Sequence, residues 1–560
     1  MFATIVEDDA RMNASFFDAG LDPALLWFPE RASEEQRLLY ASIRQFAEID
    51  MAPHEAALER HDHATARALF RQCAALGLFA AELDEADGGL GFGVVESTLL
   101  CEALGRGHSL NVGLMVHQGV GMLPVACFGT PEQREAWLPG AAAGERIMAF
   151  ALTEPHCGSD ALALATTAEP EGGAYRITGA KQFITNAAYA DCFITFARIP
   201  GTGITAFLVD ANTPGLSVGP EEKKLGQHAS STCSVSYDRV SVPAGNILGE
   251  VGKGHRIALT MLNLGRLKLA AACVGKMKVL LPEGVTYVQA RTAFGQPLSA
   301  FGMLRDRLAR MAALSFATES ALYRVASLME QALEAARGDG AVLGNAERLA
   351  VLQDFALECA LVKSFATESL GAFTDDLLQL YGGYGFSEEY PAAKAFRDAR
   401  VTRLYEGTTE ICRLTAVRRA FALAATATLE GTAVMSGDLR AVTSAKAAFG
   451  RYLKSLLAGE GFDPEHFHRA QDQTGELALA LEAIYAVESG WLRCGAMPAD
   501  SAARDLVSYF ESRLAAPAYA VFLPAPPNHG AGVNLGADAP TRDRIVAALI
   551  ESRGVLPGSL

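Results

Sequence analysis

A glutamate that stands between apolar residues and a glycine is the first candidate for chemistry in this sequence. Glu406 lies within residues 403–411, which read RLYEGTTEI and lead into a predicted helix. A carboxylate in a dry pocket has a raised pKa and becomes a usable general base near neutral pH. The competing interpretation is a surface glutamate that caps the following helix, and the pattern alone favours that cap.

A second segment places turn residues directly after a predicted strand. Residues 152–160 read LTEPHCGSD and follow the strand that we predict over residues 147–152. A strand that runs into a Gly/Ser turn exposes N–H groups and hydroxyls, which suit the edge of a flavin ring or a phosphate. An ordinary β-turn closed by Ser and Asp side chains explains the bare pattern equally well.

Two further segments combine aromatic residues with a strand end or a turn. Residues 181–186 (KQFITN) offer an aromatic ring that could stack on a flavin and a hydroxyl that could donate to it. Taken alone, Phe183 is better explained as a core residue. Residues 379–386 (QLYGGYGF) form a Gly-rich turn after a helix, which lets a ligand approach the backbone. They do not match the phosphate-loop pattern.

The elements that must position these segments follow one another in blocks. Hydrophobic spacing predicts helices from Ser33 onwards, short β-branched runs replace them near Ile147, and the helical period returns near Gly254. This order of helices, sheet and helices indicates an α+β chain. Helices are predicted over residues 33–46, 65–76, 94–105, 112–128, 255–279, 302–336 and 345–370 and after Thr130, and strands over 147–152, 175–183, 192–196, 204–209, 216–218 and 233–240.

The sequence after about residue 424 is Ala-rich and helical, with breaks at residues 459–463 and 497–499 and a loop-rich stretch from Pro517 onwards. Residues 438–457 carry Arg440, Lys446, Arg451 and Lys454 among apolar residues. Such a helix could touch a membrane surface weakly. A core-packing helix with a solvated basic face is the favoured interpretation.

Composition excludes several classes of protein. The chain has 560 residues, 50% of them hydrophobic, and a formal net charge of −16, which argues against a broad grip on nucleic acid. Its ten cysteines form no CxxC pair, so a zinc ribbon or a disulfide framework is not indicated. The acidic first residues do not read as a secretory signal, and no run of eighteen uninterrupted apolar residues occurs. The expected location is the cytoplasm, and we expect no metal site.

Taken together, the four segments resemble, in order and at comparable spacing, the acyl-CoA dehydrogenase family, and most of all its very-long-chain branch. The resemblance covers residues 35 to 424 and is supported by EEKKLG at 221–226, NILGEVG at 246–252, NLGR at 263–266, RTAFG at 291–295 and LARM at 308–311. It implies an irregular segment (1–32), an N-terminal helical domain (33–148), a central β domain (149–252) and a four-helix bundle (253–424). The helical extension (425–560) also resembles that branch.

The family binds FAD and oxidises an acyl thioester to the trans-2-enoyl product. The resemblance assigns Glu406 as the base that removes the proton next to the thioester carbonyl, while hydride passes to flavin N5. It implies that the developing enolate is stabilised by the backbone N–H of the base and by a flavin ribityl hydroxyl, because preorganised donors are needed there.

The resemblance also carries over the binding residues. Those implied for the cofactor are Phe150, Leu152, Thr153, Gly158, Ser159, Phe183, Ile184, Thr185, Arg291, Phe294, Gln379, Gly382, Gly383, Thr408 and Glu410. Those implied for the substrate are Ser159, Asn263, Arg266 and Gly407. An intrahelical ion pair is the other interpretation of Arg266. Gly119 and Gly121 could leave room for a long acyl tail or serve helix packing.

Three positions depart from the family pattern. Phe183 stands where many relatives carry Trp, and either ring can stack. Residues 282–284 (PEG) interrupt what is a continuous helix in the family, so we expect a break or kink just before Arg291. Gly302 follows Phe301 where a Gln is usual and cannot supply that side-chain contact to FAD.

The resemblance leaves partners and rival functions open. It implies an acyl-CoA substrate, or an acyl-carrier-protein thioester in a biosynthetic pathway, and an electron-transferring flavoprotein as acceptor. A cofactor shared between subunits and an extension that covers the tetramer face imply a homodimer. The alternatives are an acyl-CoA oxidase, a DNA-repair-associated relative, for which the acidic charge offers no support, and a non-catalytic scaffold.

Overall fold

The computed structural model describes residues 16–17, 21–337, 345–426, 437–458, 470–497, 502–519 and 539–560. The chain divides into two compact units. The mixed unit comprises Glu34–Gly275 and Ala336–Leu349, and the helical unit comprises Met1–Ser33, Lys276–Ala335 and Ala350–Leu560. Each unit is described by itself below. The predicted breaks at residues 459–463 and 498–499 lie outside the described residues.

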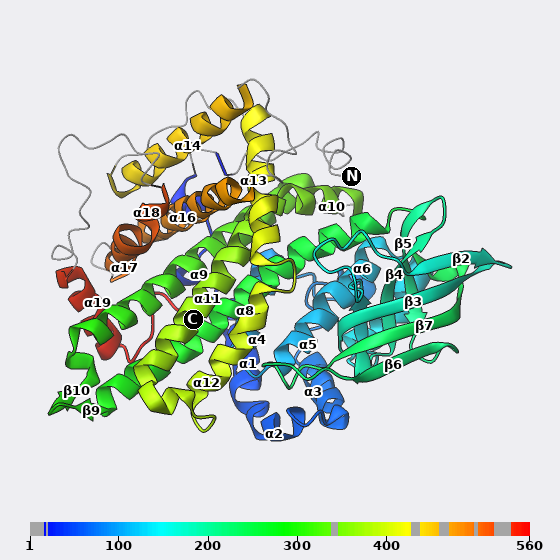
Figure 1. The fold of residues 1–560 in the computed structure, drawn as a ribbon, viewed down its shortest axis with the longest axis horizontal. Helices are drawn as coiled ribbons and strands as arrows, with labels where there is room; N and C mark the ends of the chain where they lie inside the picture. The colour runs from blue at the N-terminus through cyan, green and yellow to red at the C-terminus, as the bar shows by residue number, and fades with distance from the viewer. Residues whose placement is uncertain are drawn as a thin grey trace. The chain divides into compact units, whose positions relative to one another are not determined.

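The mixed unit begins with helices that cover its N-terminal third (Figure 1). They are α1 (Glu34–Gln45), α2 (Glu55–Leu58), α3 (His63–Ala75), α4 (Val94–Gly105), α5 (Leu110–Val116), α6 (Leu123–Phe128) and α7 (Pro131–Ala142). Local capping explains two starts: the Asp62 carboxylate accepts from the first N–H groups of α3, and Thr130 and Gln133 form a capping box before α7. The helices predicted after residues 33, 65, 94, 112 and 130 are thus confirmed.

An eight-stranded sheet follows these helices in the chain. Its strands are β1 (Met148–Ala151), β2 (Thr167–Glu171), β3 (Ala174–Thr185), β4 (Cys192–Ile199), β5 (Gly203–Asp210), β6 (Leu216–Glu221), β7 (Thr232–Pro243) and β8 (Ile247–Leu248). The order is β6-β7-β3-β2-β4-β5-β8, and β1 pairs with β4 in parallel. Phe193, Phe207 and Val235 belong to the core of one face. All six predicted strands are confirmed, whereas β2 and β8 were not predicted.

One histidine of the mixed unit, His117, has a fully buried side chain. His117 accepts the Met148 N–H at Nδ1 (3.1 Å), and its Nε2 lies 3.0 Å from the Ala141 carbonyl. The neutral ring satisfies both contacts when Nε2 carries the hydrogen, whereas a proton on Nδ1 would face the Met148 N–H. Burial lowers the pKa of His117 to about 4.

This histidine is expected to make the protein less stable in mild acid. Its folded-state pKa lies below the unfolded value, so the unfolded chain takes up the proton first as the pH falls. The free energy of unfolding should drop by about 2 kcal/mol between pH ~7 and pH ~5 from this group alone. Urea unfolding at both pH values measures the slope. His117→Gln should lose that contribution, while His54→Gln should retain it; equal slopes in all three proteins would contradict the assignment.

The helical unit is built from long helices (Figure 1). They are the second part of α8 (Gly254–Ala290), α9 (Gly302–Arg337), α11 (Ala356–Tyr381), α12 (Pro391–Arg400), α13 (Thr409–Thr426), α14 (Arg440–Ala458), α16 (Gln471–Gly495), α17 (Ala503–Phe510), α18 (Ala516–Tyr519) and α19 (Ala539–Glu551). A hairpin of β9 (Thr292–Ala293) and β10 (Gln296–Pro297) separates α8 from α9, and α10 (Asn345–Asp354) precedes α11.

The predicted break at residues 282–284 is wrong, because α8 continues through Pro282 to Ala290. Proline removes one helical N–H, yet the C-terminal tail packs against this turn. A Cβ on Gly554, whose φ is +83°, would lie 2.6 Å from the Pro282 Cα. The loop-rich prediction for the C-terminus is also wrong over α19, whose Pro540 occupies the first helical turn, where proline is tolerated.

The C-terminal extension joins the long helices of its unit through buried ion pairs. Glu488 of α16 binds Arg324 of α9 (2.8 Å) and Lys446 of α14, and all three side chains are buried. Arg493 of α16 likewise binds Glu319 of α9 and Glu30, each at 2.8 Å. Because Lys446 is fully buried, α14 is a core-packing helix, as favoured, but its basic face is not wholly solvated.

Within the part of the chain that the structure describes, two helical stretches are long and apolar enough to cross a membrane by composition alone. These are Leu110–Phe128 and α8, and 83% and 72% of their apolar windows are buried inside the protein. Buried core helices pass the same test, so neither stretch carries an argument for a membrane span.

Candidate active site

The base candidate lies on a loop of the helical unit between α12 and α13. Glu406 has φ +56° and the next residue, Gly407, has φ +88°, so two consecutive residues are left-handed. The Glu406 side chain is half-buried. A left-handed non-glycine residue is costly and persists only where its surroundings hold it. Such strain is common where a side chain must be aimed at a reacting group.

Glu406 is not the cap of the following helix. The Ile411 N–H donates to Thr408 Oγ1 (3.3 Å), so Thr408 caps α13. The pKa of Glu410, in the first turn of α13, is lowered by its own backbone N–H and by a hydrogen bond from Thr408. The capping interpretation that the pattern favoured therefore applies to Thr408 and Glu410 rather than to Glu406.

In the mixed unit, a buried ion pair fixes the turn after β1. Lys181 of β3 binds the Glu154 carboxylate at 2.7 Å and donates to the Leu152 carbonyl at 3.1 Å. Glu154 also accepts the N–H groups of Ala165 (2.7 Å) and Thr166 (3.1 Å). Burial opposes ionisation of Glu154, but these hydrogen bonds keep its pKa below the usual value. The turn is therefore closed by Glu154 rather than by the predicted Ser and Asp side chains.

Among the expected cofactor residues of this segment, Leu152 is buried, so its backbone rather than its side chain could reach a ligand, while the others lie at the surface of the unit. Gly158 and Ser159 are exposed and Thr153 is half-buried. The Gln182 N–H donates to the Thr153 carbonyl (2.9 Å), which brings Thr153 next to Phe183. These residues could present hydroxyls and an N–H to a ligand that stacks on the Phe183 ring.

Phe183 is not a core residue. It lies at a register shift between β3 and β7, has φ +58° and is 63% exposed. A bulge re-aims a side chain away from the sheet's regular alternation. Thr185 is half-buried, whereas Ile184 belongs to the core of the sheet, so only its backbone can reach a ligand. Phe150 is half-buried against Phe196.

The Gly-rich turn of the helical unit borders a pocket of about 400 Å³. Its lining consists of Tyr287, Arg291, Leu298, Leu380, Tyr381, Gly382, Gly383 and Tyr384. Arg291 stacks over Tyr384 (5.5 Å), and Tyr287 stacks on Tyr381 (3.9 Å). Burial raises the pKa of Tyr381 to about 12, which keeps its phenol neutral. The pocket combines one exposed cation with aromatic faces, which suits a phosphate-bearing aromatic ligand.

Two glycines open this pocket. Gly382 has φ +58°, and a Cβ on Gly382 or Gly383 would meet nothing within 4 Å, so a ligand can approach the backbone. Gln379 is exposed and its carbonyl accepts the Gly382 N–H. Phe294, at the tip of the β9–β10 hairpin, is 96% exposed. Sequence reasoning missed Tyr287, although it lies one helical turn before Arg291, and it missed Tyr384.

The substrate residues expected on α8 lie in the mixed unit. Asn263 and Arg266 are both buried, and Arg266 Nη1 donates to Asn263 Oδ1 at 3.2 Å. Arg266 thus makes an intrahelical contact, which is the hydrogen bond to Asn263. Gly121 packs closely: a Cβ there would lie 3.0 Å from the Met148 Cβ, which agrees with the packing interpretation.

Three family models match this chain in succession. They describe the acyl-CoA dehydrogenase N-terminal domain (residues 33–145), middle domain (149–240) and C-terminal domain (252–421). An acyl-CoA dehydrogenase of Bacillus subtilis is 36% identical over 387 residues, which are 68% of this chain and 97% of the relative. The bovine mitochondrial very long-chain specific acyl-CoA dehydrogenase is 37% identical over 405 residues, which are 69% of this chain but only 58% of that relative.

One solved structure also matches the extension. The acyl-CoA dehydrogenase from Bacillus anthracis, complexed with FAD, has a TM-score of 0.86 and 30% identity, and the match covers 97% of this chain and 99% of that one. The fold and the order of the three matched domains agree with these matches. The chain belongs to the acyl-CoA dehydrogenase family of FAD-dependent oxidoreductases.

Proposed function

We propose that the chain oxidises a long-chain fatty acyl-CoA to its trans-2-enoyl thioester, with Glu406 as the base. The observation that carries this proposal is the geometry of Glu406, a left-handed glutamate just before α13, whose first turn is capped by Thr408 instead. The assignment of the base to this residue is proposed on the family resemblance. The similarity to a very long-chain specific relative supports the chain length.

The residues present fit FAD. Thr153 offers a hydroxyl beside the segment that carries the exposed Phe183 ring, on which a flavin can stack, and Ser159 offers an exposed hydroxyl six residues further along the chain. Arg291 offers a positive charge to a pyrophosphate at a pocket with two unobstructed glycines. A bound FAD would supply hydride acceptance at N5.

The residues of the chain would then remove the proton next to the thioester carbonyl and stabilise the charge that develops. Glu406 would take the hydrogen next to the thioester carbonyl as a proton. Because that hydrogen is very weakly acidic, the negative charge that develops on the carbonyl oxygen must be stabilised, and the Glu406 N–H is the donor that the family supplies. A buried substrate would exclude water and raise the pKa of the carboxylate.

Product analysis tests this function. With palmitoyl-CoA and an artificial electron acceptor, we expect a CoA ester lighter by two hydrogens that co-elutes with the trans-2-enoyl standard. Butyryl-CoA should be turned over more slowly if the pocket prefers long chains. Turnover without added acceptor, with stoichiometric peroxide, would instead favour the oxidase. A palmitoyl-CoA sample that remains unchanged with acceptor present would contradict the proposal.

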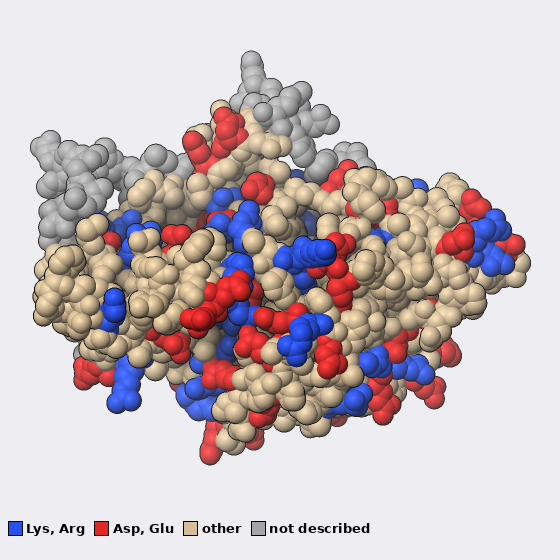
Figure 2. All heavy atoms as spheres, turned by 60° about the horizontal axis from the view of Figure 1, so that its bottom comes forward, with Lys and Arg blue, Asp and Glu red and all other residues tan. Residues whose placement is uncertain are grey.

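The electron acceptor and the oligomeric state are proposed on the family resemblance. We propose electron-transferring flavoprotein as the acceptor and a homodimer as the assembly. The cytoplasmic location stays a proposal that does not rest on the resemblance. A DNA-associated role gains no support from the face that Figure 2 shows. On the face in Figure 2, the lysines and arginines of the described residues are interspersed with aspartates and glutamates, which does not form the basic stripe that a phosphate backbone needs.

A further inference from the structure

The loop that carries Glu406 must be held by its surroundings. Residues 406 and 407 are both left-handed, and the loop belongs to neither α12 nor α13. Nothing in regular secondary structure therefore fixes the direction of the glutamate side chain. Helix α13 contributes thiol contacts from Cys412 Sγ to the carbonyls of Glu406 (3.9 Å) and Gly407 (3.6 Å), and a thiol is a weak donor. The stronger polar contacts with the loop come from α11.

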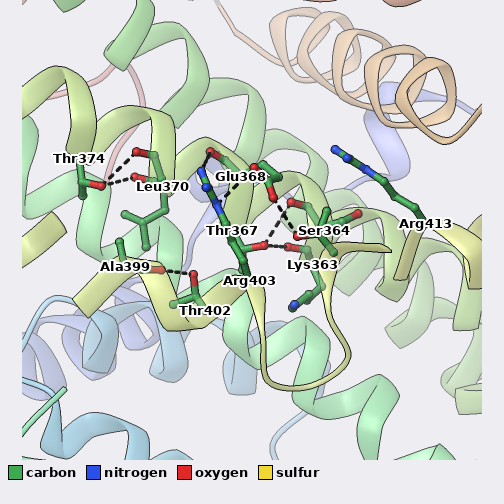
Figure 3. A network of polar contacts seen from close by, with 12 residues as sticks. Lys363, Ser364, Thr367, Glu368, Leu370, Thr374, Ala399, Thr402, Arg403 and Arg413 are labelled. Carbon is green, nitrogen blue, oxygen red and sulfur yellow. Dashed lines mark hydrogen bonds and ion pairs between the residues drawn. The ribbon is translucent and has the colours of Figure 1, made fainter. Parts of the chain in front are cut away.

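The beginning of the loop is anchored on α11 by Glu368. Arg403 Nε lies 3.2 Å from the Glu368 carboxylate, and Arg403 Nη2 donates to the Glu368 carbonyl at 3.4 Å. Gly371 provides the space: a Cβ there would lie 1.8 Å from Arg403 Nη2. At the other end of the loop, Thr409 Oγ1 donates to the Glu368 carboxylate at 2.8 Å. Figure 3 shows Arg403 lying along Glu368 of this helix.

The middle of the loop is held by a lysine. Lys363, one and a half turns earlier on α11, is fully buried, and its Nζ donates to the Gly407 carbonyl at 2.6 Å. Figure 3 shows its side chain extending from the helix towards the loop. The contact is made with the residue directly after the base. A charge-assisted hydrogen bond is roughly twice as strong as a neutral one, and a lysine is buried only at a cost.

We propose that Lys363 is a positioning residue for catalysis, which holds the Gly407–Thr408 peptide by its carbonyl, keeps Glu406 and Gly407 in their left-handed conformations and so aims the Glu406 carboxylate at the substrate. This inference deepens the proposed function and rests on it. Lys363 acts through the loop and exchanges no proton with the substrate. Its loss should therefore slow the step that Glu406 performs and leave acyl-CoA binding nearly unchanged.

The test compares FAD-loaded Lys363→Met with the parent by two measurements. Hydrogen–deuterium exchange should show faster exchange of the amides in residues 404–409 in the variant. Stopped-flow reduction of the flavin at saturating palmitoyl-CoA should show a rate constant lower by about 10- to 100-fold, with the same amplitude per bound FAD and a KM within about threefold. A merely structural defect would lower the amplitude rather than the rate constant.

A matched control and a second variant complete the test. Thr367→Val removes a buried hydroxyl of α11 that donates to the helix carbonyls of Lys363 and Ser364, and it should match the parent in both measurements. If Lys363→Met does not fold, Lys363→Gln, whose amide is one atom too short for the contact, takes its place. Parental exchange in residues 404–409 would overturn the inference, whether or not palmitoyl-CoA reduces the flavin. A parent enzyme that is not reduced would overturn the proposed function alone.

Discussion

Glu406→Gln is expected to lower kcat for palmitoyl-CoA by about 10³- to 10⁴-fold, the upper part of the range for one positioned general base. The amide keeps the size of the side chain but cannot accept the α-proton. The loop contacts of Lys363, Arg403 and Thr409 involve other groups and should persist. The variant should therefore remain folded, bind FAD and show an unchanged visible spectrum, with turnover measured by an artificial acceptor.

The control for this prediction is another glutamate of the helical unit. Glu388→Gln changes an exposed carboxylate whose partner is Arg397 (3.1 Å), and its turnover should stay within about twofold of the parent because exposed ion pairs contribute little. A Glu406→Gln enzyme that retains more than about a tenth of the parental kcat would show that another group removes the proton.

Glu488→Gln is expected to lower the free energy of unfolding by about 3–5 kcal/mol. Two buried cations, Arg324 and Lys446, would lose the carboxylate that they share between α9, α14 and α16. Burial opposes ionisation of Glu488, but Lys446 and Arg324 keep its pKa below the usual value. Its contribution to stability is therefore present above the ordinary pKa of glutamate and is lost as the pH falls through the lowered value.

Urea denaturation near neutral pH measures this effect as a shift of the midpoint. Asp505→Asn is the matched control, since it removes one carboxylate from an ion pair with Arg544, which is 58% exposed. That substitution should cost no more than about 1 kcal/mol. Equal midpoints for Glu488→Gln and Asp505→Asn would contradict the idea that the buried cluster ties the extension to α9.

The sequence predicted those parts of the fold in which local patterns agree with the tertiary environment. The helix over Val94–Gly105 and the strands β4 and β5 follow directly from hydrophobic spacing. The strand β2 reads TAEPE, with Pro170 and two glutamates, and nothing local marks it as part of a sheet. It is a strand because it pairs with β3.

The site residues likewise divide into those that the sequence predicted and those that depend on contacts between distant parts of the chain. Glu406, Thr153 and Phe183 were found because their segments match a family, whereas residue type alone pointed to a cap, a turn and a core position. The left-handed φ of Phe183 arises from a register shift between two strands, which no local pattern encodes. The buried ions were missed because their partners are distant: Arg324 and Glu488 are 164 residues apart in sequence.

The visible spectrum of the purified protein during anaerobic addition of palmitoyl-CoA measures directly whether a bound flavin is reduced by a long-chain acyl-CoA. We expect the parent protein to be yellow and to bleach, and the Glu406→Gln protein to stay yellow. A yellow parent that remains oxidised would contradict a long-chain CoA substrate and direct attention to other acyl groups or carrier-bound thioesters. A colourless protein that cannot be reconstituted with FAD would contradict the conclusion that the chain is an FAD-dependent enzyme.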